Sequence, residues 1–154
     1  MSEKIRVEQV RVELTRRLRG AVLRPGLSAK LSIYPSDALP DAQHFAAWSG
    51  NKIVGVASIH PEPIEEFKNK NAWRLRGMAV DPNFQGRGIG KQILDECLNF
   101  VKRFDAEILW CNGRQSALGF YQSCGFKIVG EEFEVAESGA HFVMMLLLNN
   151  QENT

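Results

Sequence analysis

Three glycines within five residues are the feature of this chain best suited to chemistry. Residues 85–91 read QGRGIGK and lie between an apparent strand and an apparent helix. Glycine lets the backbone turn sharply and approach a ligand closely, and the first turn of a helix presents unpaired N–H groups and the positive end of its dipole. The spacing therefore predicts an anion site suited to a phosphate-bearing cofactor.

Two familiar phosphate-binding motifs match this loop poorly. The dinucleotide fingerprint Gly-x-Gly-x-x-Gly requires one more residue before its third glycine than the chain has between Gly88 and Gly90. A Walker loop requires four residues between its first glycine and a Gly-Lys-Ser/Thr ending. Here Gly90 and Lys91 are followed by Gln92, and the spacing to the earlier glycines is shorter. The loop alone leaves open another phosphate-bearing cofactor or a tight turn that binds nothing.

The hydrophobic pattern predicts the elements that position this loop. Predicted strands lie at 43–48, 52–60, 73–80, 107–111, 126–135 and 141–147. Predicted helices lie at 7–23, 88–104 and 115–124. The expected order is strand, helix, three strands, helix, strand, helix and two strands, which favours a mixed α/β (α+β) sandwich over a repetitive doubly wound fold. Residues 27–41 are expected to form a long loop that shapes a substrate pocket.

Length and charge narrow the class of protein. A chain of 154 residues predicts a single domain over 1–154, and 19 basic against 18 acidic side chains favour neither nucleic-acid nor membrane-surface binding. The absence of a secretory leader and of a long apolar run predicts a cytoplasmic protein. Cys97, Cys111 and Cys124 lack Cys-x-x-Cys spacing, so we expect reduced thiols and no metal site. Whether the chain forms a homodimer stays open.

Two motifs resemble those of the GNAT N-acetyltransferase superfamily. Gln85, Gly88 and Gly90 match its acetyl-CoA loop, Gln/Arg-x-x-Gly-x-Gly/Ala. Residues 117–126, ALGFYQSCGF, are similar to its Ala-x-x-Phe-Tyr-x-x-x-Gly-Phe pattern. Both occur in the family's order, and the resemblance covers residues 73–129. It implies a sandwich with a central, mostly antiparallel sheet flanked by helices on both faces, and an acyl-CoA-dependent N-acetyltransferase.

The resemblance also implies which residues contact acetyl-CoA, the expected cosubstrate. The loop's backbone amides and cations would hold the pyrophosphate, the preceding strand would pair with the pantetheine, and two further side chains would face the cofactor. These expected cofactor contacts are Met78, Ala79, Val80, Gln85, Gly86, Arg87, Gly88, Ile89, Gly90, Lys91, Asn112 and Tyr121.

The implied reaction is direct attack of a primary amine of a small molecule or peptide on the acetyl thioester, in a ternary complex. The resemblance places the family's tyrosine at Tyr121, whose phenol could protonate the leaving thiolate. His141, Glu134 and Glu137 are candidates for the base that deprotonates the amine. His60 at a strand end and a water-mediated route are weaker alternatives.

Other interpretations stay open at this point. A noncatalytic acyl-CoA-binding module would keep the loop, and a cysteine-dependent thioesterase would use Cys111 or Cys124 as nucleophile. Arg74 and Arg76 share a predicted strand face that could bind an anionic substrate group, although a solvated charged face is the preferred interpretation. Arg16, Arg17 and Arg19 are expected on a solvated helix face. The acceptor and its acyl group are not specified.

Overall fold

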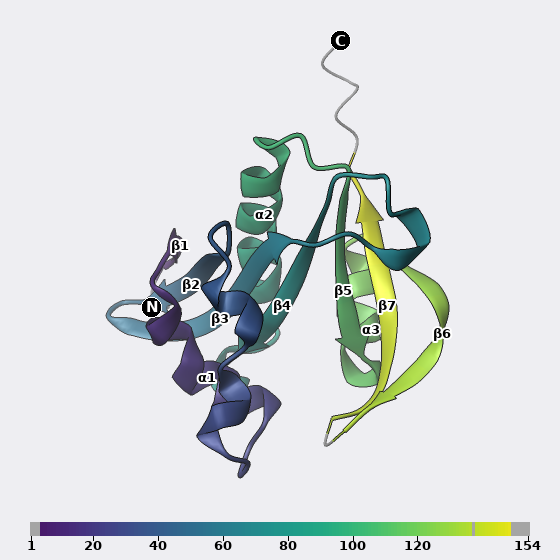
Figure 1. Cartoon of the computed structure of the whole chain (residues 1–154). Coiled ribbons are helices and arrows are strands. Elements are labelled where there is room, and N and C mark those ends of the chain that lie inside the picture. Colours follow the sequence, from purple (N-terminus) through teal and green to yellow (C-terminus); the bar gives the residue numbers. More distant parts are fainter. Residues whose placement is uncertain (1–3, 137, 149–154) are drawn as a thin grey trace. The chain divides into compact units, whose positions relative to one another are not determined.

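The structure is a computed structural model that describes residues 4–136 and 138–148 (Figure 1). Seven strands follow the hydrogen-bonded order β1-β2-β3-β4-β5-β7-β6. They are β1 Ile5–Gln9, β2 Gln43–Ser49, β3 Lys52–Pro61, β4 Ala72–Val80, β5 Ile108–Arg114, β6 Lys127–Val135 and β7 Gly139–Leu147. The α-helices are α1 Arg16–Leu23, α2 Ile89–Lys102 and α3 Leu118–Ser123. The predicted element order and the mixed α/β class are confirmed.

The chain forms two compact units. The first comprises Met1–His60 and Arg76–Asn99, and the second comprises Pro61–Leu75 and Phe100–Thr154. In the first, β1 with β2 and β2 with β3 pair antiparallel. In the second, β5 with β7 and β7 with β6 pair antiparallel, whereas β4 runs parallel to β5 over Ala72–Arg74. The extent of a single domain over 1–154 stays a prediction.

Helices cover both faces of the sheet in the first unit. Ala46 and Val56, which are register partners, pack with Leu18 of α1. The next pair, Ala47 and Gly55, points the other way, because successive strand residues alternate between faces. A Cβ added at Gly55 would lie 2.7 Å from Ile93 Cδ1 of α2. The missing side chain at Gly55 therefore lets α2, the helix that follows the glycine loop, pack closely against β3.

The sheet of the second unit has two chemically different faces. Directly paired residues of β5 and β7 point to the same face of the sheet. One face, which we call the Asn112 face, carries Trp110, Asn112, Arg114, His141, Val143 and Met145. The other carries Cys111 and Gly113, and a Cβ at Gly113 would lie 3.3 Å from Tyr121 Cδ2 of α3. We call this second surface the α3 face.

The predicted helix at 7–23 is wrong in its first half. The chain forms β1, then a 3₁₀ turn at Val12–Thr15, and becomes α-helical only at Arg16. Ile5 and Val7 alternate with Arg6 and Glu8, a two-residue period that suits a half-buried strand. The predicted loop at 27–41 contains two 3₁₀ turns, Ala29–Ser32 and Pro35–Ala38.

Three boundaries also differ by a few residues. β5 continues to Arg114, β7 begins at Gly139, and α3 follows a 3₁₀ turn at Gln115–Ala117. Gly125 adopts a φ of 97°, the left-handed conformation that commonly ends a helix, just after α3. No helix in residues 4–136 and 138–148 is both long and apolar enough to cross a membrane.

Candidate active site

The exit from β4 sets the direction of the glycine loop. The backbone N–H of Asp81 donates to the Val54 carbonyl at 2.8 Å, and the Asp81 carboxylate accepts from the N–H of Asn83 at 2.9 Å. Gln85 reaches back through Nε2 to the Val80 carbonyl at 3.1 Å. These bonds close a short 3₁₀ turn, Pro82–Phe84, at the end of the strand. The predicted loop therefore starts from a fixed position on β4.

Two glycines of the loop have left-handed backbones. Gly86 has a φ of 79° and Gly88 a φ of 78°, and a Cβ at either position would meet no atom within 4 Å. Glycine is required there by conformation, since the space beside it is empty. Ile89 then begins α2, whose first N–H groups have no partner within the helix. This arrangement suits close approach by a phosphate group.

Cationic side chains accompany the loop. The guanidinium of Arg87 lies over the Phe84 ring at 5.0 Å, and the Lys52 ammonium lies 5.5 Å from the same ring. Lys91 forms an exposed ion pair with Asp95 one turn along α2, at 3.3 Å. Arg87 is therefore positioned by an aromatic face and adds positive charge to the loop.

A left-handed glycine also lies within β4. Gly77 has a φ of 65°, and a Cβ there would lie 2.8 Å from Arg19 Nε. The predicted pantetheine contacts, Met78, Ala79 and Val80, come directly after it. Ala79 is buried in the core, whereas Met78 and Val80 are half-buried.

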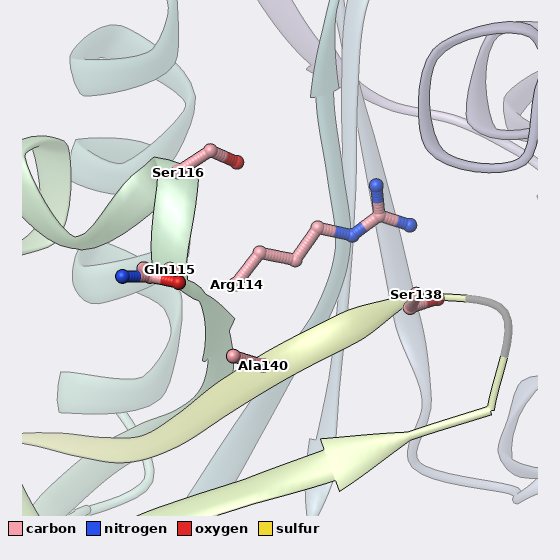
Figure 2. A pocket seen from close by; sticks show the side chains of 5 residues that line it. All are labelled: Arg114, Gln115, Ser116, Ser138 and Ala140. Carbon is pink, nitrogen blue, oxygen red and sulfur yellow. The ribbon is translucent and has the colours of Figure 1, made fainter.

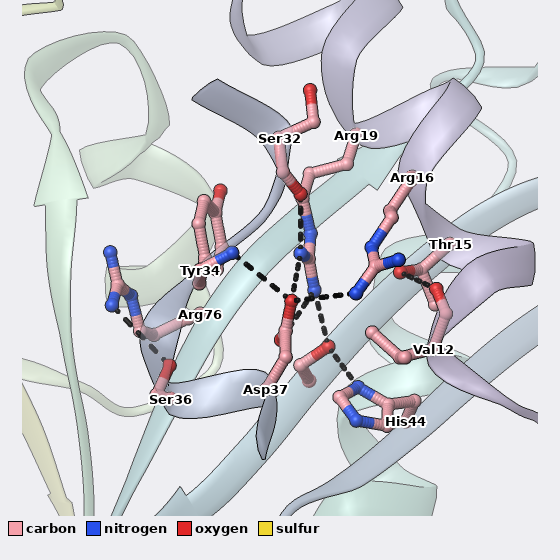
Figure 3. Close-up of polar contacts among 11 residues, drawn as sticks. Val12, Thr15, Arg16, Arg19, Ser32, Tyr34, Ser36, Asp37, His44 and Arg76 are labelled. Carbon is pink, nitrogen blue, oxygen red and sulfur yellow. Dashed lines mark hydrogen bonds and ion pairs between the residues drawn. The ribbon is translucent and has the colours of Figure 1, made fainter. Parts of the chain in front are cut away.

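A polar network that the sequence did not reveal is centred on Arg19 in the first unit (Figure 3). Arg19 is only 1% exposed, so its predicted place on a solvated face is wrong. It donates from Nη1 to the Ser32 carbonyl at 2.8 Å and to Asp37 Oδ2 at 2.9 Å, and from Nη2 to Ser58 Oγ at 2.8 Å. Ser58 Oγ is 2.7 Å from His44 Nδ1.

Burial and charge set the protonation of this network. Burial favours the neutral carboxyl of Asp37, but the hydrogen bond and charge of Arg19 outweigh it and hold the Asp37 pKa below its usual value. Burial also lowers the pKa of His44, and the charges of Arg19 and Arg16 act in the same direction, whereas the carboxylate of Asp37 opposes them. The network therefore holds an ionised Asp37 and a neutral His44 at pH 7.

Tyr34 lies between two guanidinium groups in the same region. Arg19 is 4.0 Å and Arg76 is 4.3 Å from its ring centroid, and Arg76 also contacts Ser36 Oγ at 3.4 Å. Arg74 has a different setting in the second unit, where it contacts Glu62 at 3.3 Å and the Trp110 ring at 4.9 Å. Each arginine thus contacts an aromatic ring, and Arg19 and Arg74 each also contact a carboxylate.

Tyr121 of α3 is largely buried, at 7% exposure, on the α3 face. Its ring packs edge-on against Phe126 at 5.3 Å and Phe120 at 5.1 Å. Burial raises the pKa of the Cys111 thiol to about 12, although a hydrogen bond with the Tyr121 side chain acts in the opposite direction. Cys111 is therefore a neutral thiol at pH 7, which argues against its use as a nucleophile.

His141 carries a defined tautomer on the opposite, Asn112 face. Its Nδ1 is 2.9 Å from the Gly139 carbonyl oxygen, which can only accept, so Nδ1 carries a proton. In the neutral ring, Nε2 then presents its lone pair. His141 is 6% exposed and its ring lies 5.9 Å from that of Phe133.

The structure does not place Glu134 beside His141. Glu134 pairs with Ala140 whereas Phe133 pairs with His141, so Glu134 and His141 point to opposite faces of the hairpin. Glu137 lies outside the described residues. His60 is buried, at 2% exposure, near the end of β3.

Asn112 lies two residues before Arg114 on the face that carries His141. Its Oδ1 is buried and accepts no hydrogen bond from the described part of the chain. A buried amide oxygen of this kind favours a ligand N–H donor, because leaving it unpaired costs about 1–3 kcal/mol. This geometry suits the predicted cofactor contact at Asn112. Within residues 4–136 and 138–148, no group of three or more His, Cys, Asp or Glu side chains could hold a metal ion.

Comparison with known proteins agrees with the fold and the two motifs. Residues 9–126 match the model of the acetyltransferase (GNAT) family. The chain is 27% identical over 140 residues to the uncharacterized N-acetyltransferase YitI of Bacillus subtilis (strain 168), covering 91% of this chain and 94% of that one. The chain therefore belongs to the GNAT family and is an acyl-CoA-dependent N-acetyltransferase.

Two further comparisons extend this relationship. The peptidyl-lysine N-acetyltransferase YjaB of Salmonella typhimurium (strain LT2) is 27% identical over 120 residues, covering 78% of this chain and 74% of that one. The crystal structure of a GNAT family acetyltransferase from Elizabethkingia anophelis with acetyl-CoA bound superposes with a TM-score of 0.68 at 20% identity, covering 94% of this chain and 98% of that one. At that identity the second likeness concerns the fold.

Proposed function

We propose that this protein transfers the acetyl group of acetyl-CoA directly to a primary amine of a small molecule or peptide. The observation that carries the proposal is the pair of left-handed glycines, Gly86 and Gly88, at the start of α2 in a chain of the GNAT family. Their open backbone and the N–H groups of the helix suit the cofactor's pyrophosphate. Arg87 and Lys91 add positive charge beside it.

The names of relatives support an amine acceptor. YjaB is named a peptidyl-lysine N-acetyltransferase. The relative from Mycobacterium tuberculosis, 33% identical over 97 residues that cover 60% of this chain and 57% of that one, is named N-alpha-acetyltransferase RimI. The solved relative from Elizabethkingia anophelis holds acetyl-CoA. We extend the cofactor and the amine class, but neither particular acceptor, to this chain.

His141 is the base in this proposal. An alkyl amine is neutral in only on the order of one part in a thousand at pH 7, so removal of its proton assists attack. With Nδ1 held by Gly139, the Nε2 atom of His141 accepts that proton. Glu134 lies on the other face of the hairpin, the α3 face that also carries Tyr121, so it stays the alternative base.

Tyr121 is the acid, and Asn112 helps to hold the cofactor. Acetyl-CoA supplies the acetyl group as a thioester, whose sulfur leaves as a thiolate. The hydroxyl of Tyr121 donates a proton to that sulfur from the α3 face. The buried Oδ1 of Asn112 accepts an N–H group of the pantetheine on the opposite face, which also carries His141, so the proposal requires the thioester to be reached from both faces. Met78, Ala79 and Val80 contribute backbone groups to the pantetheine, as an added strand would.

A transfer screen tests this function. The protein is mixed with isotopically labelled acetyl-CoA and a panel of polyamines, amino acids, aminoglycosides, arylamines and peptides, and the labelled products are detected by mass spectrometry. We expect label to appear on at least one amine class in proportion to enzyme. Binding of acetyl-CoA without transfer to any amine would favour the noncatalytic module. Hydrolysis of the thioester that requires Cys124 would favour the thioesterase.

A further inference from the structure

β1 is the edge strand of the first unit. It stands at one end of the strand order, and within the described part of the chain it pairs only with β2 (Figure 1). Just past β1, the backbone N–H of Val10 donates to the His44 carbonyl at 2.9 Å, which continues the β1–β2 register. Hydrogen-bonded pairs recur at every second residue of an antiparallel ladder, so the backbone groups of Glu8 and Arg6 also point to β2. The residues whose backbone N–H and C=O groups point outward are Ile5, Val7 and Gln9.

This outward edge is open and regular. Within residues 4–136 and 138–148, no strand or turn bonds to the outward groups, and β1 pairs with β2 without a register shift. An unpaired strand edge of this kind is a template for a further strand.

β6, at the other end of the strand order, is built differently. Its pairing with β7 shifts register between Val129 and Phe133, and Gly130 has a φ of 79°. A bulge of this kind turns an edge away from further pairing. The tip of the same hairpin borders a polar pocket of about 370 Å³ lined by Arg114, Gln115, Ser116, Ser138 and Ala140 (Figure 2). Of the two edges, β1 is therefore the one suited to an added strand.

Two opposite charges on β1 are exposed beside this edge. The side chains of Arg6 and Glu8 are 52% and 51% exposed, and they lie on the same face of the strand. Arg6 donates from Nε to Glu8 at 3.2 Å and from Nη1 to the Gly50 carbonyl at 3.0 Å, and its guanidinium lies over the Trp48 ring. Nη2 has no acceptor in the described part of the chain, so the guanidinium can bind a second carboxylate while it keeps both bonds.

A second copy of β1 fits this edge in one antiparallel register. When the pairing is centred on Val7, Val7 meets Val7, and Ile5 meets Gln9 of the second copy. All of these residues point their backbone groups outward, so the pairing forms about six hydrogen bonds. In the same register Arg6 of each copy faces Glu8 of the other, and such non-hydrogen-bonded pairs bring side chains closest.

The neighbouring registers are unfavourable. The next register in one direction places Arg6 opposite Arg6 of the second copy, and the next in the other direction places Glu8 opposite Glu8. Like charges directly opposite each other destabilise a strand pair. The order of charges along β1 thus selects the register centred on Val7.

We propose that β1 is a dimer interface, which pairs with β1 of a second copy of this chain about a two-fold axis at Val7. A two-fold axis requires a self-complementary surface, and the sequence Arg6-Val7-Glu8 supplies one. The backbone bonds provide affinity and the charges fix the register. A single strand pair is smaller than a standard interface, so we expect a dissociation constant in the micromolar range. The inference is independent of the proposed function, because β1 carries none of the residues assigned to the cofactor or to catalysis.

Charge reversal tests the interface by sedimentation velocity over low to high micromolar concentrations. The wild-type chain should reach twice the monomer mass. Arg6→Glu and Glu8→Arg should each weaken the dimer by about tenfold or more, because like charges then face each other. An equal mixture of the two variants should dimerise again, since every facing pair in the mixed dimer joins opposite charges. Lys68→Glu reverses a charge at the exposed ion pair with Glu65 and should leave dimerisation unchanged.

Val7→Pro tests the backbone pairing itself. It removes an outward N–H at the centre of the interface and leaves the ladder with β2 intact, so the variant should fold, as judged by circular dichroism, but stay monomeric. A wild-type chain that is monomeric at every concentration would exclude a second copy as the occupant and overturn the proposal. A dimer that survives Val7→Pro and both charge reversals would lie on another surface and would overturn it equally. A wild-type dimer without recovery in the mixture would contradict the register.

Discussion

The Nδ1 proton of His141 is bound to the backbone carbonyl of Gly139, 2.9 Å away and two residues back along the same strand. Because a carbonyl oxygen accepts only, this contact leaves Nε2 as the basic atom of the neutral ring. The hairpin that carries the histidine thus determines which nitrogen can accept a proton. This relationship leads to the first test.

His141→Gln should lower kcat for acetyl transfer by about 10²-fold or more, the usual range for loss of a general base. Glutamine keeps hydrogen-bonding atoms at this position but is not a base, so only the chemical step should be impaired and acetyl-CoA affinity should be unchanged. Single-turnover rates and calorimetric binding of acetyl-CoA separate the two effects. A kcat within about threefold of the wild-type value in a folded variant would remove His141 from the mechanism.

Tyr121→Phe should lower kcat by about 10²-fold while the KM for acetyl-CoA changes little, because only the proton donor is lost. The phenyl ring preserves the packing against Phe126 and above Gly113. Tyr34→Phe is the matched control, since the chain has two tyrosines and this one stacks between guanidinium groups. Unchanged turnover of Tyr121→Phe at several pH values would leave Tyr121 with a packing role only.

Gly88→Asp should weaken acetyl-CoA binding by about tenfold or more, measured by calorimetry, because it places a negative charge beside the pyrophosphate. Gly26→Asp is the control, because it places the same side chain on another left-handed glycine and so causes the same backbone strain away from the loop. Gly26 has a φ of 77°, and a Cβ there also meets no atom within 4 Å. Gly26→Asp should lose stability, by about 1 kcal/mol, but keep its affinity. Equal affinity of the two folded variants would contradict the phosphate site.

The stability of the fold should decrease as the pH falls from about 7 to 5. The His44 pKa is lower in the folded protein than the usual value of 6.5. Below that value the unfolded chain takes up a proton that folded His44 does not yet bind, which favours unfolding. Asp37, whose pKa is also lowered, adds to this loss only below 3.8. Chemical denaturation should show a smaller pH dependence for His44→Gln, and an unchanged dependence would refute this account.

Much of the fold could be predicted from local pattern. The strand before the loop, the glycine turn and the helix after it are contiguous, so their residue types and spacing suffice. The expected order begins with a strand, but the range of β1 was missed because Val7, Val10 and Leu14 fit a helical period as well as Ile5 and Val7 fit a strand. The register with β2, which sequence does not specify, resolves that ambiguity.

The polar network centred on Arg19 could not be predicted for a related reason. Arg19 meets Ser58, 39 residues away, and it looks like any other arginine of a basic helix. Gly77 within a strand was the available signal, since an interior glycine indicates a bulge or a close approach. The sequence also does not show which face of the sheet each residue of the β6–β7 hairpin occupies, because the face depends on the strand register. The register places Glu134 on the face opposite His141 and makes Arg114 the direct partner of His141.

The most direct test of the account is a rapid-quench, single-turnover reaction between the protein, labelled acetyl-CoA and an amine identified in the screen. Intact-protein mass spectrometry follows the label over time. Direct transfer predicts that label passes to the amine while the protein stays unlabelled at every time point. Label that appears first on the protein, at Cys111 or Cys124, and then moves to the amine would contradict the proposed mechanism.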